Sequence, residues 1–91
     1  MQISLRLPAL KQAFSYSSTT SIYEAISNGL LPKPIKLGQR TSAWPADEVE
    51  LVLTARAGGA SEIQLRQLVD RIHSKRSERW AALQADLGVT A

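Results

Sequence analysis

Two prolines near the middle of the chain, Pro32 and Pro34, constrain its fold more than any other feature. Proline fixes φ and lacks a backbone N–H, and the residue before a proline is also pushed out of the helical region. The connector that contains these residues is therefore extended. The Asn28-Gly29 pair stops a helix before the connector, because glycine adopts the left-handed conformation at little cost. The prolines thus separate a helical first part of the chain from the remainder.

A small β-hairpin is predicted directly after the prolines. Residues 35–37 alternate apolar and polar side chains, as a half-exposed strand does. The Gly38-Gln39 pair offers a tight turn, so that residues 40–44 can return antiparallel. A two-stranded hairpin is marginal by itself, so it must lean on the helices or pair with the alternating residues 3–5. Trp44 is the expected anchor of the hairpin in the core.

Two short helices are predicted before the prolines. Pro8 suits the first position of a helix over residues 8–13, where its missing N–H is not needed. Ser17 or Ser18 can cap a second helix over residues 19–28 by accepting a backbone hydrogen bond. Two short helices joined by about four residues are typical of a helix-turn-helix.

Further helices are predicted in the second half of the chain. Pro45 opens one that ends near Ala57, and the Gly58-Gly59 pair marks a boundary. We therefore expect a mainly α fold with a small β-hairpin, in three segments. These are a winged helix-turn-helix over 1–57, a linker over 58–60 and a helical extension over 61–91.

The extension carries apolar positions that predict contact with a second copy of the chain or with another protein. Basic residues interrupt its apolar stripe, so that either the helix breaks near residues 74–77 or two apolar patches flank an exposed basic middle. Residues 61–73 can alternatively fold back on their own domain. The predicted association residues are Leu65, Leu68, Ile72, Trp80, Leu83 and Leu87. The basic residues that interrupt the apolar stripe are Lys75, Arg76 and Arg79.

Composition excludes several classes of function. The chain has 91 residues, no cysteine and one histidine, so that it lacks thiolate ligands and any histidine-rich site. His73, in a charged stretch, is expected at the surface. The acidic residues Asp47, Glu48 and Glu50 lie in the first turns of a predicted helix, where they complement the positive end of the helix dipole. We expect no enzymatic activity, no catalytic residues, no metal and no cofactor. No apolar run is long enough to span a membrane, which favours a cytoplasmic location.

Charge and side-chain type favour nucleic-acid binding. No acidic residue lies between Glu24 and Asp47, whereas Lys33, Lys36 and Arg40 all do. Such an excess attracts polyanions. The second helix offers short hydroxyl side chains and a tyrosine that suit phosphates and base edges, whereas Glu24 repels phosphate or accepts a hydrogen bond from cytosine. The hydroxyl residues are also ordinary helix caps.

The run from Ser18 to Tyr23, the stretch LPKPIKLGQR over residues 31–40, and Trp44 followed by Glu48-Val49 resemble the AlpA-like regulators of prophages and mobile elements. These are related to excisionase and MerR-type winged-helix modules. The likeness covers about residues 5–57 and implies sequence-specific binding to double-stranded DNA. Many relatives carry arginine or lysine at the positions of Thr19 and Glu24. Because this helix lacks those charges, the hairpin is expected to supply more of the affinity for DNA. The expected DNA-binding residues are Ser18, Thr19, Thr20, Tyr23, Glu24, Lys33, Lys36, Gln39 and Arg40.

Three functions are compatible with this sequence. The first is a transcriptional regulator with its second helix in the major groove and its hairpin on phosphates or in the minor groove. The second is an excisionase-type factor that bends DNA for a recombinase. The third, of another class, is a protein–protein adaptor whose winged domain does not bind DNA.

Overall fold

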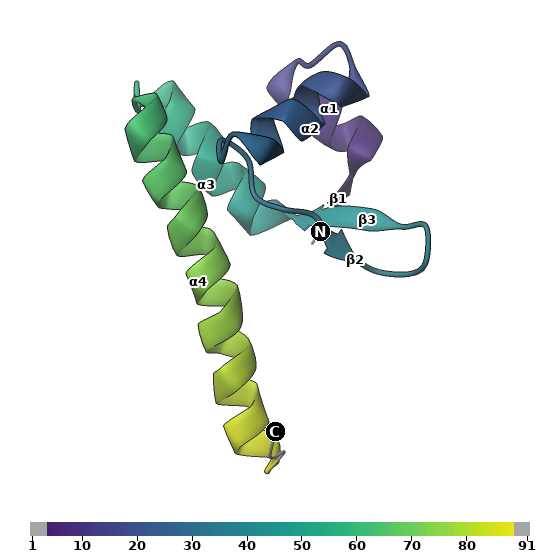
Figure 1. Cartoon of the computed structure of the whole chain (residues 1–91), viewed down its shortest axis with the longest axis vertical. Coiled ribbons are helices and arrows are strands. Elements are labelled where there is room, and N and C mark those ends of the chain that lie inside the picture. Colours follow the sequence, from purple (N-terminus) through teal and green to yellow (C-terminus); the bar gives the residue numbers. More distant parts are fainter. Residues whose placement is uncertain (1–3, 89–91) are drawn as a thin grey trace.

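Two short helices and the turn between them form the first part of the chain in the computed structural model, which describes residues 4–88. Helix α1 (Leu7–Phe14) has a proline in its first turn and ends at Ser15, whose φ of 58° lies in the left-handed region. Helix α2 (Thr19–Ser27) is capped by Ser18, whose Oγ accepts the backbone N–H of Ser21 at 3.2 Å. The predicted helix-turn-helix is confirmed (Figure 1).

A three-stranded antiparallel sheet follows the order β1-β3-β2. Strand β1 (Ser4–Arg6) and strand β2 (Ile35–Lys36) both pair with β3 (Ser42–Pro45), which is therefore the central strand. The predicted support of the hairpin by the N-terminal strand is confirmed for residues 4 and 5, and residue 3 lies outside the described residues. This third strand removes the weakness of an isolated hairpin.

The tip of the hairpin is wider than predicted. A two-residue turn at Gly38-Gln39 is wrong, because Lys36 pairs with Ser42 and the Leu37 N–H donates to the Thr41 carbonyl at 3.0 Å. This register is centred on Gln39. The returning strand consequently begins at Ser42 and not at residue 40, which leaves Arg40 in the loop at the tip.

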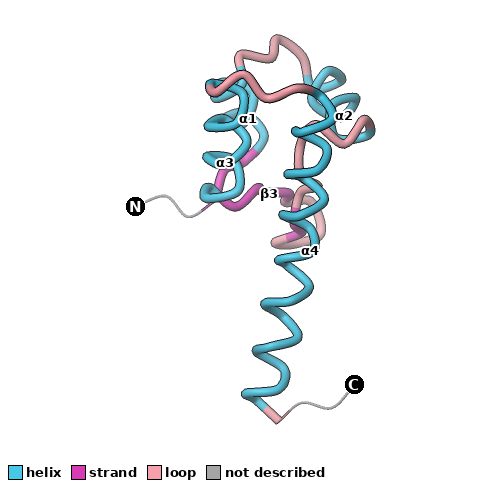
Figure 2. Tube along the Cα trace, turned by 90° about the vertical axis from the view of Figure 1, so that its left-hand side faces the viewer, coloured by secondary structure: helices cyan, strands magenta, loops and turns pink. Residues whose placement is uncertain are grey.

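Two further helices complete the chain. Helix α3 (Ala46–Ala57) follows β3 directly, and helix α4 (Glu62–Leu87) begins with a capping box in which Ser61 and Gln64 exchange hydrogen bonds. Helix α4 is unbroken across residues 74–77. The alternative of a break in this segment is therefore wrong, and the extension is one continuous helix. Figures 1 and 2 show that its C-terminal half projects beyond the rest of the domain. The fold is mainly helical with a small sheet, as expected for a winged helix-turn-helix with a C-terminal helix.

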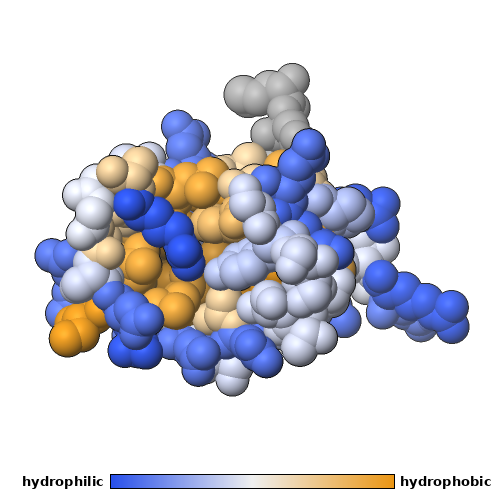
Figure 3. Space-filling model, turned by 90° about the horizontal axis from the view of Figure 1, so that it is seen from above, coloured by the Kyte–Doolittle hydropathy of each residue, from blue (hydrophilic) through white to orange (hydrophobic). Residues whose placement is uncertain are grey.

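The hydrophobic core lies where the sheet, α1, α2, α3 and the first half of α4 meet. Trp44 is fully buried, as predicted, and its indole Nε1–H donates to the Pro32 carbonyl oxygen at 2.9 Å. Seen from above, the molecule shows apolar surface surrounded by hydrophilic side chains (Figure 3). The fully buried hydrophobic side chains include Leu10, Ile22, Leu31, Trp44, Val52 and Val69.

The first half of α4 belongs to this core. Leu65 and Ile72, two residues expected to mediate association, are only 6% and 4% exposed and pack within their own chain. Leu68 is partly buried against the same core. Residues 61–73 thus fold back on their own domain, the alternative to association for this segment. The apolar face that α4 leaves open lies further along, at Trp80, Leu83 and Leu87.

Candidate nucleic-acid interface

Helix α2 has one buried face and one open face. Ile22 and Ala25 point into the core, with exposed fractions of 0% and 6%. The residues between and before them are exposed and have short or hydrogen-bonding side chains. The exposed positions on this helix are Thr19, Thr20, Tyr23, Glu24 and Ser27, and the first four of them were predicted to face DNA. Ser18, also predicted, is half-buried, because its hydroxyl is engaged in the helix cap and bonds the Ser21 hydroxyl at 2.9 Å.

The hairpin, which we call the wing (residues 35–45), presents the second group of predicted residues. Lys36, Gln39 and Arg40 are exposed. The widened tip places Gln39 at its centre and Arg40 next to it, away from the strand ladder. Neither Lys36 nor Arg40 forms an ion pair with another residue in the range 4–88. Both cations are therefore available to an external anion.

A surface hollow brings the helix and the wing together. Its lining includes Tyr23 of α2, Arg40 and Ser42 of the wing, and Arg6 at the end of β1. Leu7 and Pro8, at the start of α1, complete the hollow. Helix and wing residues that are 17 positions apart in the sequence thus share one concave surface, which is the arrangement the helix-plus-wing hypothesis requires.

Arg6 is a basic residue that was not among the predicted DNA contacts. It is exposed, and it lies opposite Ala43 in the pairing of β1 with β3, next to the point where the wing loop returns. The predicted pairing of residues 3–5 with the hairpin was the signal that could have placed it there. The sequence does not give the register of β1 on β3, however, and it therefore does not place Arg6 beside the wing.

The charge of this half of the chain is strongly one-sided. Residues 1–46 contain five basic residues and a single acid, Glu24, whereas residues 47–91 contain six basic and seven acidic residues. The hollow has two arginines and no acidic residue in its lining. A concave surface with one sign of charge concentrates counter-ions of the opposite sign.

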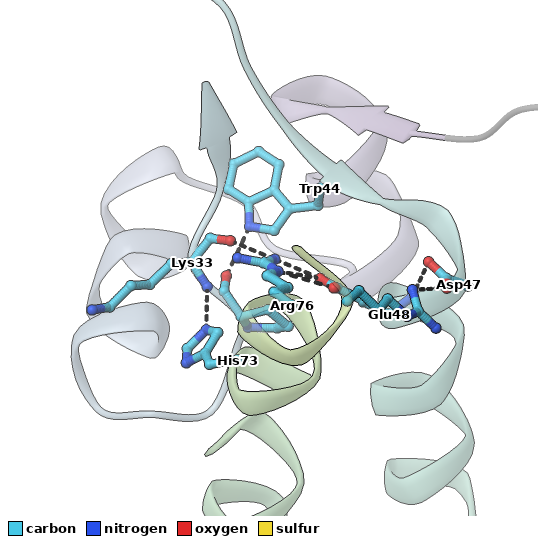
Figure 4. A network of polar contacts seen from close by, with 8 residues as sticks. Lys33, Trp44, Asp47, Glu48, His73 and Arg76 are labelled. Atoms are coloured by element: carbon cyan, nitrogen blue, oxygen red, sulfur yellow. Dashed lines mark hydrogen bonds and ion pairs between the residues drawn. The ribbon is translucent and has the colours of Figure 1, made fainter. Parts of the chain in front are cut away.

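Lys33 occupies a different place from the wing residues. Its side chain is exposed and points away from the connector's partners on α4 (Figure 4). Its backbone is held on both sides: the N–H donates to His73 Nε2 at 3.0 Å, and the carbonyl accepts from Arg76 Nη2 at 2.8 Å. Lys33 does not line the hollow. The structure therefore does not bring it together with Tyr23 and Arg40.

Helix α4 fixes the backbone that leads from α2 to the wing. Arg66 Nε donates to the carbonyl of Asn28, the residue that ends α2, at 3.0 Å. His73 and Arg76 hold Lys33 in the same connector. Gly29, which has a φ of 76°, allows the turn after α2 to pass beside the Arg66 side chain. The C-terminal helix thus determines how the α2 helix and the wing are placed relative to each other.

Arg76 and Glu48 form the central ion pair of this network (Figure 4). Arg76 Nε donates to Glu48 Oε2 at 2.9 Å, and Arg76 Nη2 donates to Glu48 Oε1. The expectation of a basic middle that is exposed throughout is therefore wrong for Arg76, whose side chain is 25% exposed. Glu48, first explained by the helix dipole, also has a specific partner from the other helix.

His73 is half-buried, and not a free surface residue as expected. Burial lowers the pKa of its imidazole, and the positive charges of Arg76 and Lys33 lower it further, against opposing effects of Glu48 and Asp70. The neutral form fits the structure, because a neutral imidazole nitrogen can accept the Lys33 N–H and a protonated one cannot.

Two other kinds of site are absent from residues 4–88. No group of three or more histidine, aspartate or glutamate side chains is placed to hold a metal ion. None of the helices in this range combines the length and apolarity that crossing a membrane requires.

Comparison with known proteins agrees with this geometry. The family model for the prophage CP4-57 regulatory protein (AlpA) matches residues 4–55, which include β1, both helices of the helix-turn-helix, the wing and most of α3. No curated protein and no solved structure matches the chain. The family match covers more than half of the sequence and ends before α4. The chain belongs to the AlpA family of prophage regulatory proteins.

Proposed function

We propose that this chain is a sequence-specific DNA-binding transcriptional regulator of a prophage or mobile element. In this proposal α2 enters the major groove, and the wing lies on backbone phosphates or in the adjacent minor groove. The observation that carries the proposal is the hollow shared by Tyr23 and Arg40. It supports simultaneous contact of α2 and the wing with one duplex. The family membership supports the regulatory role.

The two elements have different tasks in this proposal. Lys36 and Arg40 supply positive charge, which provides most of the sequence-independent affinity for DNA. Thr19, Thr20 and Tyr23 supply hydrogen-bonding and apolar groups that can distinguish base edges in the major groove. Affinity is thus assigned mainly to the wing, and specificity mainly to α2. Glu24 is the one acidic side chain on this face.

Selection of bound sequences from a random or genomic DNA pool tests the proposal directly. Enrichment of one sequence pattern is the expected result, and the spacing of its repeats gives the arrangement of subunits on DNA. Recovery of unenriched DNA at low salt, together with a tight protein partner, would favour the adaptor function. A strong bend at an attachment site without binding at any promoter would favour the excisionase function.

Arg40→Ala gives the second test, with the duplex recovered by selection. Loss of one phosphate contact is expected to reduce the slope of log affinity against log salt by about 0.9. Lys75→Ala, on α4, removes the same charge away from the hollow and serves as the control. Equal slopes for both variants would show that the wing does not touch phosphate.

We also propose that the projecting end of α4 associates with a second copy of the chain. Trp80, Leu83 and Leu87 are 54%, 54% and 67% exposed, and they follow each other at spacings of three and four residues. This spacing forms a seam along one side of a helix, as in helix pairs. A dimer would let a small domain whose α2 helix carries no basic residue bind two adjacent sites. The DNA-binding half of each copy would stay free.

A further inference from the structure

We infer that Arg6 is a phosphate-binding residue and that the hollow it shares with Arg40 receives one segment of the DNA backbone. This inference rests on the proposed function and adds to it a residue outside both the helix-turn-helix and the wing. It begins from the sheet register. Arg6 is opposite Ala43 in the register, at the end of β1, and it lines the hollow together with Arg40 and Ser42.

The side chain of Arg6 has no structural duty within the described part of the chain. It is exposed, it forms no ion pair with any residue in the range 4–88, and it gives no side-chain cap to α1. Three exposed arginines outside the hollow differ. Arg66 holds the end of α2, Arg71 is near Glu78, and Arg56 lies over the Phe14 ring. Arg6 is thus a free cation that the fold places in a concave surface.

The chemistry of the hollow fits a phosphodiester. Two arginines line it, Arg6 at the end of β1 and Arg40 in the wing loop, and guanidinium donors match the oxygens of a phosphate better than a point charge does. Tyr23 and Ser42 add hydroxyl groups, which also occur among phosphate contacts in DNA complexes. Leu7 and Pro8 form an apolar side of the hollow. No carboxylate lines it.

The position of the hollow also fits a duplex in the proposed orientation. Tyr23 belongs to the exposed face of α2, so the hollow begins at the edge of the helix that is placed in the major groove. Arg40 belongs to the wing tip, on the other side of the hollow. A strand of the DNA backbone that borders the major groove would pass between these two residues. Arg6 would then contact that strand from the sheet side.

Salt dependence of binding to a mixed-sequence duplex tests this inference with the full-length chain. Arg6→Gln is expected to make the slope of log affinity against log salt shallower by about 0.9, the value for one lost phosphate contact. Arg71→Gln, on α4, removes the same charge outside the hollow and is the matched control. Thermal unfolding of each variant checks that the fold is retained. Equal slopes for Arg6→Gln and Arg71→Gln would overturn the inference.

Ethylation interference locates the contact. At one phosphate, ethylation should reduce DNA binding by the wild type but not by Arg6→Gln. The phosphate identified in the same way for Arg40→Gln should be the same one or its neighbour. Separation by several nucleotides would refute a shared backbone segment. If inorganic phosphate raises the unfolding temperature of the wild type but not of Arg6→Gln, while the salt slopes of DNA binding are equal for Arg6→Gln and Arg71→Gln, the hollow binds free phosphate, and the assignment to DNA is wrong. If the wild type itself binds no DNA, the proposed function is wrong. This result is distinct from equal salt slopes of the two variants, which refute only the role of Arg6.

Discussion

The guanidinium group of Arg76 on α4 donates hydrogen bonds to both carboxylate oxygens of Glu48 on α3 and another to the carbonyl oxygen of Lys33. One side chain therefore joins α3, α4 and the connector that leads into the wing. The Glu48 side chain is 9% exposed, so that water contributes little to its solvation. The stability of the domain and the position of the wing both depend on this pair.

Arg76→Ala is expected to lower the free energy of unfolding by about 3–5 kcal/mol, because it leaves a buried carboxylate without its partner. Urea unfolding followed by circular dichroism measures the change. The double variant Glu48→Leu with Arg76→Met should lose far less, since no charge remains buried. Arg71→Ala, which removes an exposed pair with Glu78 at 3.6 Å, should cost less than about 1 kcal/mol. Equal losses for Arg76→Ala and Arg71→Ala would contradict the role given to the pair.

His73 should make stability depend on pH in one direction. Its folded-state pKa lies below the ordinary value of about 6.5, so the unfolded chain binds a proton more readily than the folded one. The contribution is complete above pH of about 6.5 and is lost as the pH falls through the folded-state pKa. His73→Gln keeps an acceptor for the Lys33 N–H and should flatten this dependence. Denaturant unfolding between neutral and mildly acidic pH measures it, and parallel curves for both proteins would refute it.

Local signals in the sequence predicted the order of the helices and the place of the hairpin. Pro8, Ser18 and the Gly58-Gly59 pair act on the backbone within a few residues of themselves, so that their effects can be derived without a fold. The same holds for the extended connector around Pro32. The family match confirms the resemblance over nearly the predicted range, residues 4–55 against about 5–57. The width of the wing tip was missed, because it depends on how β3 pairs with two neighbours.

Contacts between residues far apart in the chain could not be predicted from the sequence pattern. Arg76 stands one helical turn after Ile72 and continues the inward face of α4, although an arginine there looks like an interruption. Its partner, Glu48, lies 28 residues away on another helix. Arg6 likewise becomes a candidate DNA contact only through its pairing with β3. In both cases the charged residue gains its role from the tertiary fold, and a single sequence contains no information on which pairs meet.

Trp44→Phe tests the hydrogen bond that anchors the connector. The substitution removes the indole donor and leaves the Pro32 carbonyl buried without a partner, which costs about 1–3 kcal/mol. Loss of ring volume in a fully buried site adds to this cost. Thermal unfolding should show a clearly lower midpoint, whereas Trp80→Phe, at an exposed position, should leave it nearly unchanged. An unchanged midpoint for Trp44→Phe would show that the bond contributes nothing.

Glu24→Gln should strengthen binding to mixed-sequence DNA a few-fold at low salt, because it removes the one acidic side chain from the exposed face of α2. If the carboxylate accepts a hydrogen bond from cytosine, the same substitution should also relax the preference at one base pair, by about 1–3 kcal/mol. Titration of labelled duplexes measures both effects. Glu50→Gln, on the exposed side of α3, changes the net charge equally and is the control. Identical behaviour of the two variants would place Glu24 away from DNA.

The apolar seam at the end of α4 predicts a concentration-dependent molar mass. Leu83→Gln combined with Leu87→Gln should keep the fold, because both side chains are exposed and the core-forming Leu65 and Ile72 are untouched. Light scattering should then show the mass of a single chain at concentrations where the wild type approaches twice that mass. Leu51→Gln, an exposed leucine on α3, should behave like the wild type. A wild type that remains monomeric at every concentration, with DNA and without it, would leave the seam without the second copy proposed for it.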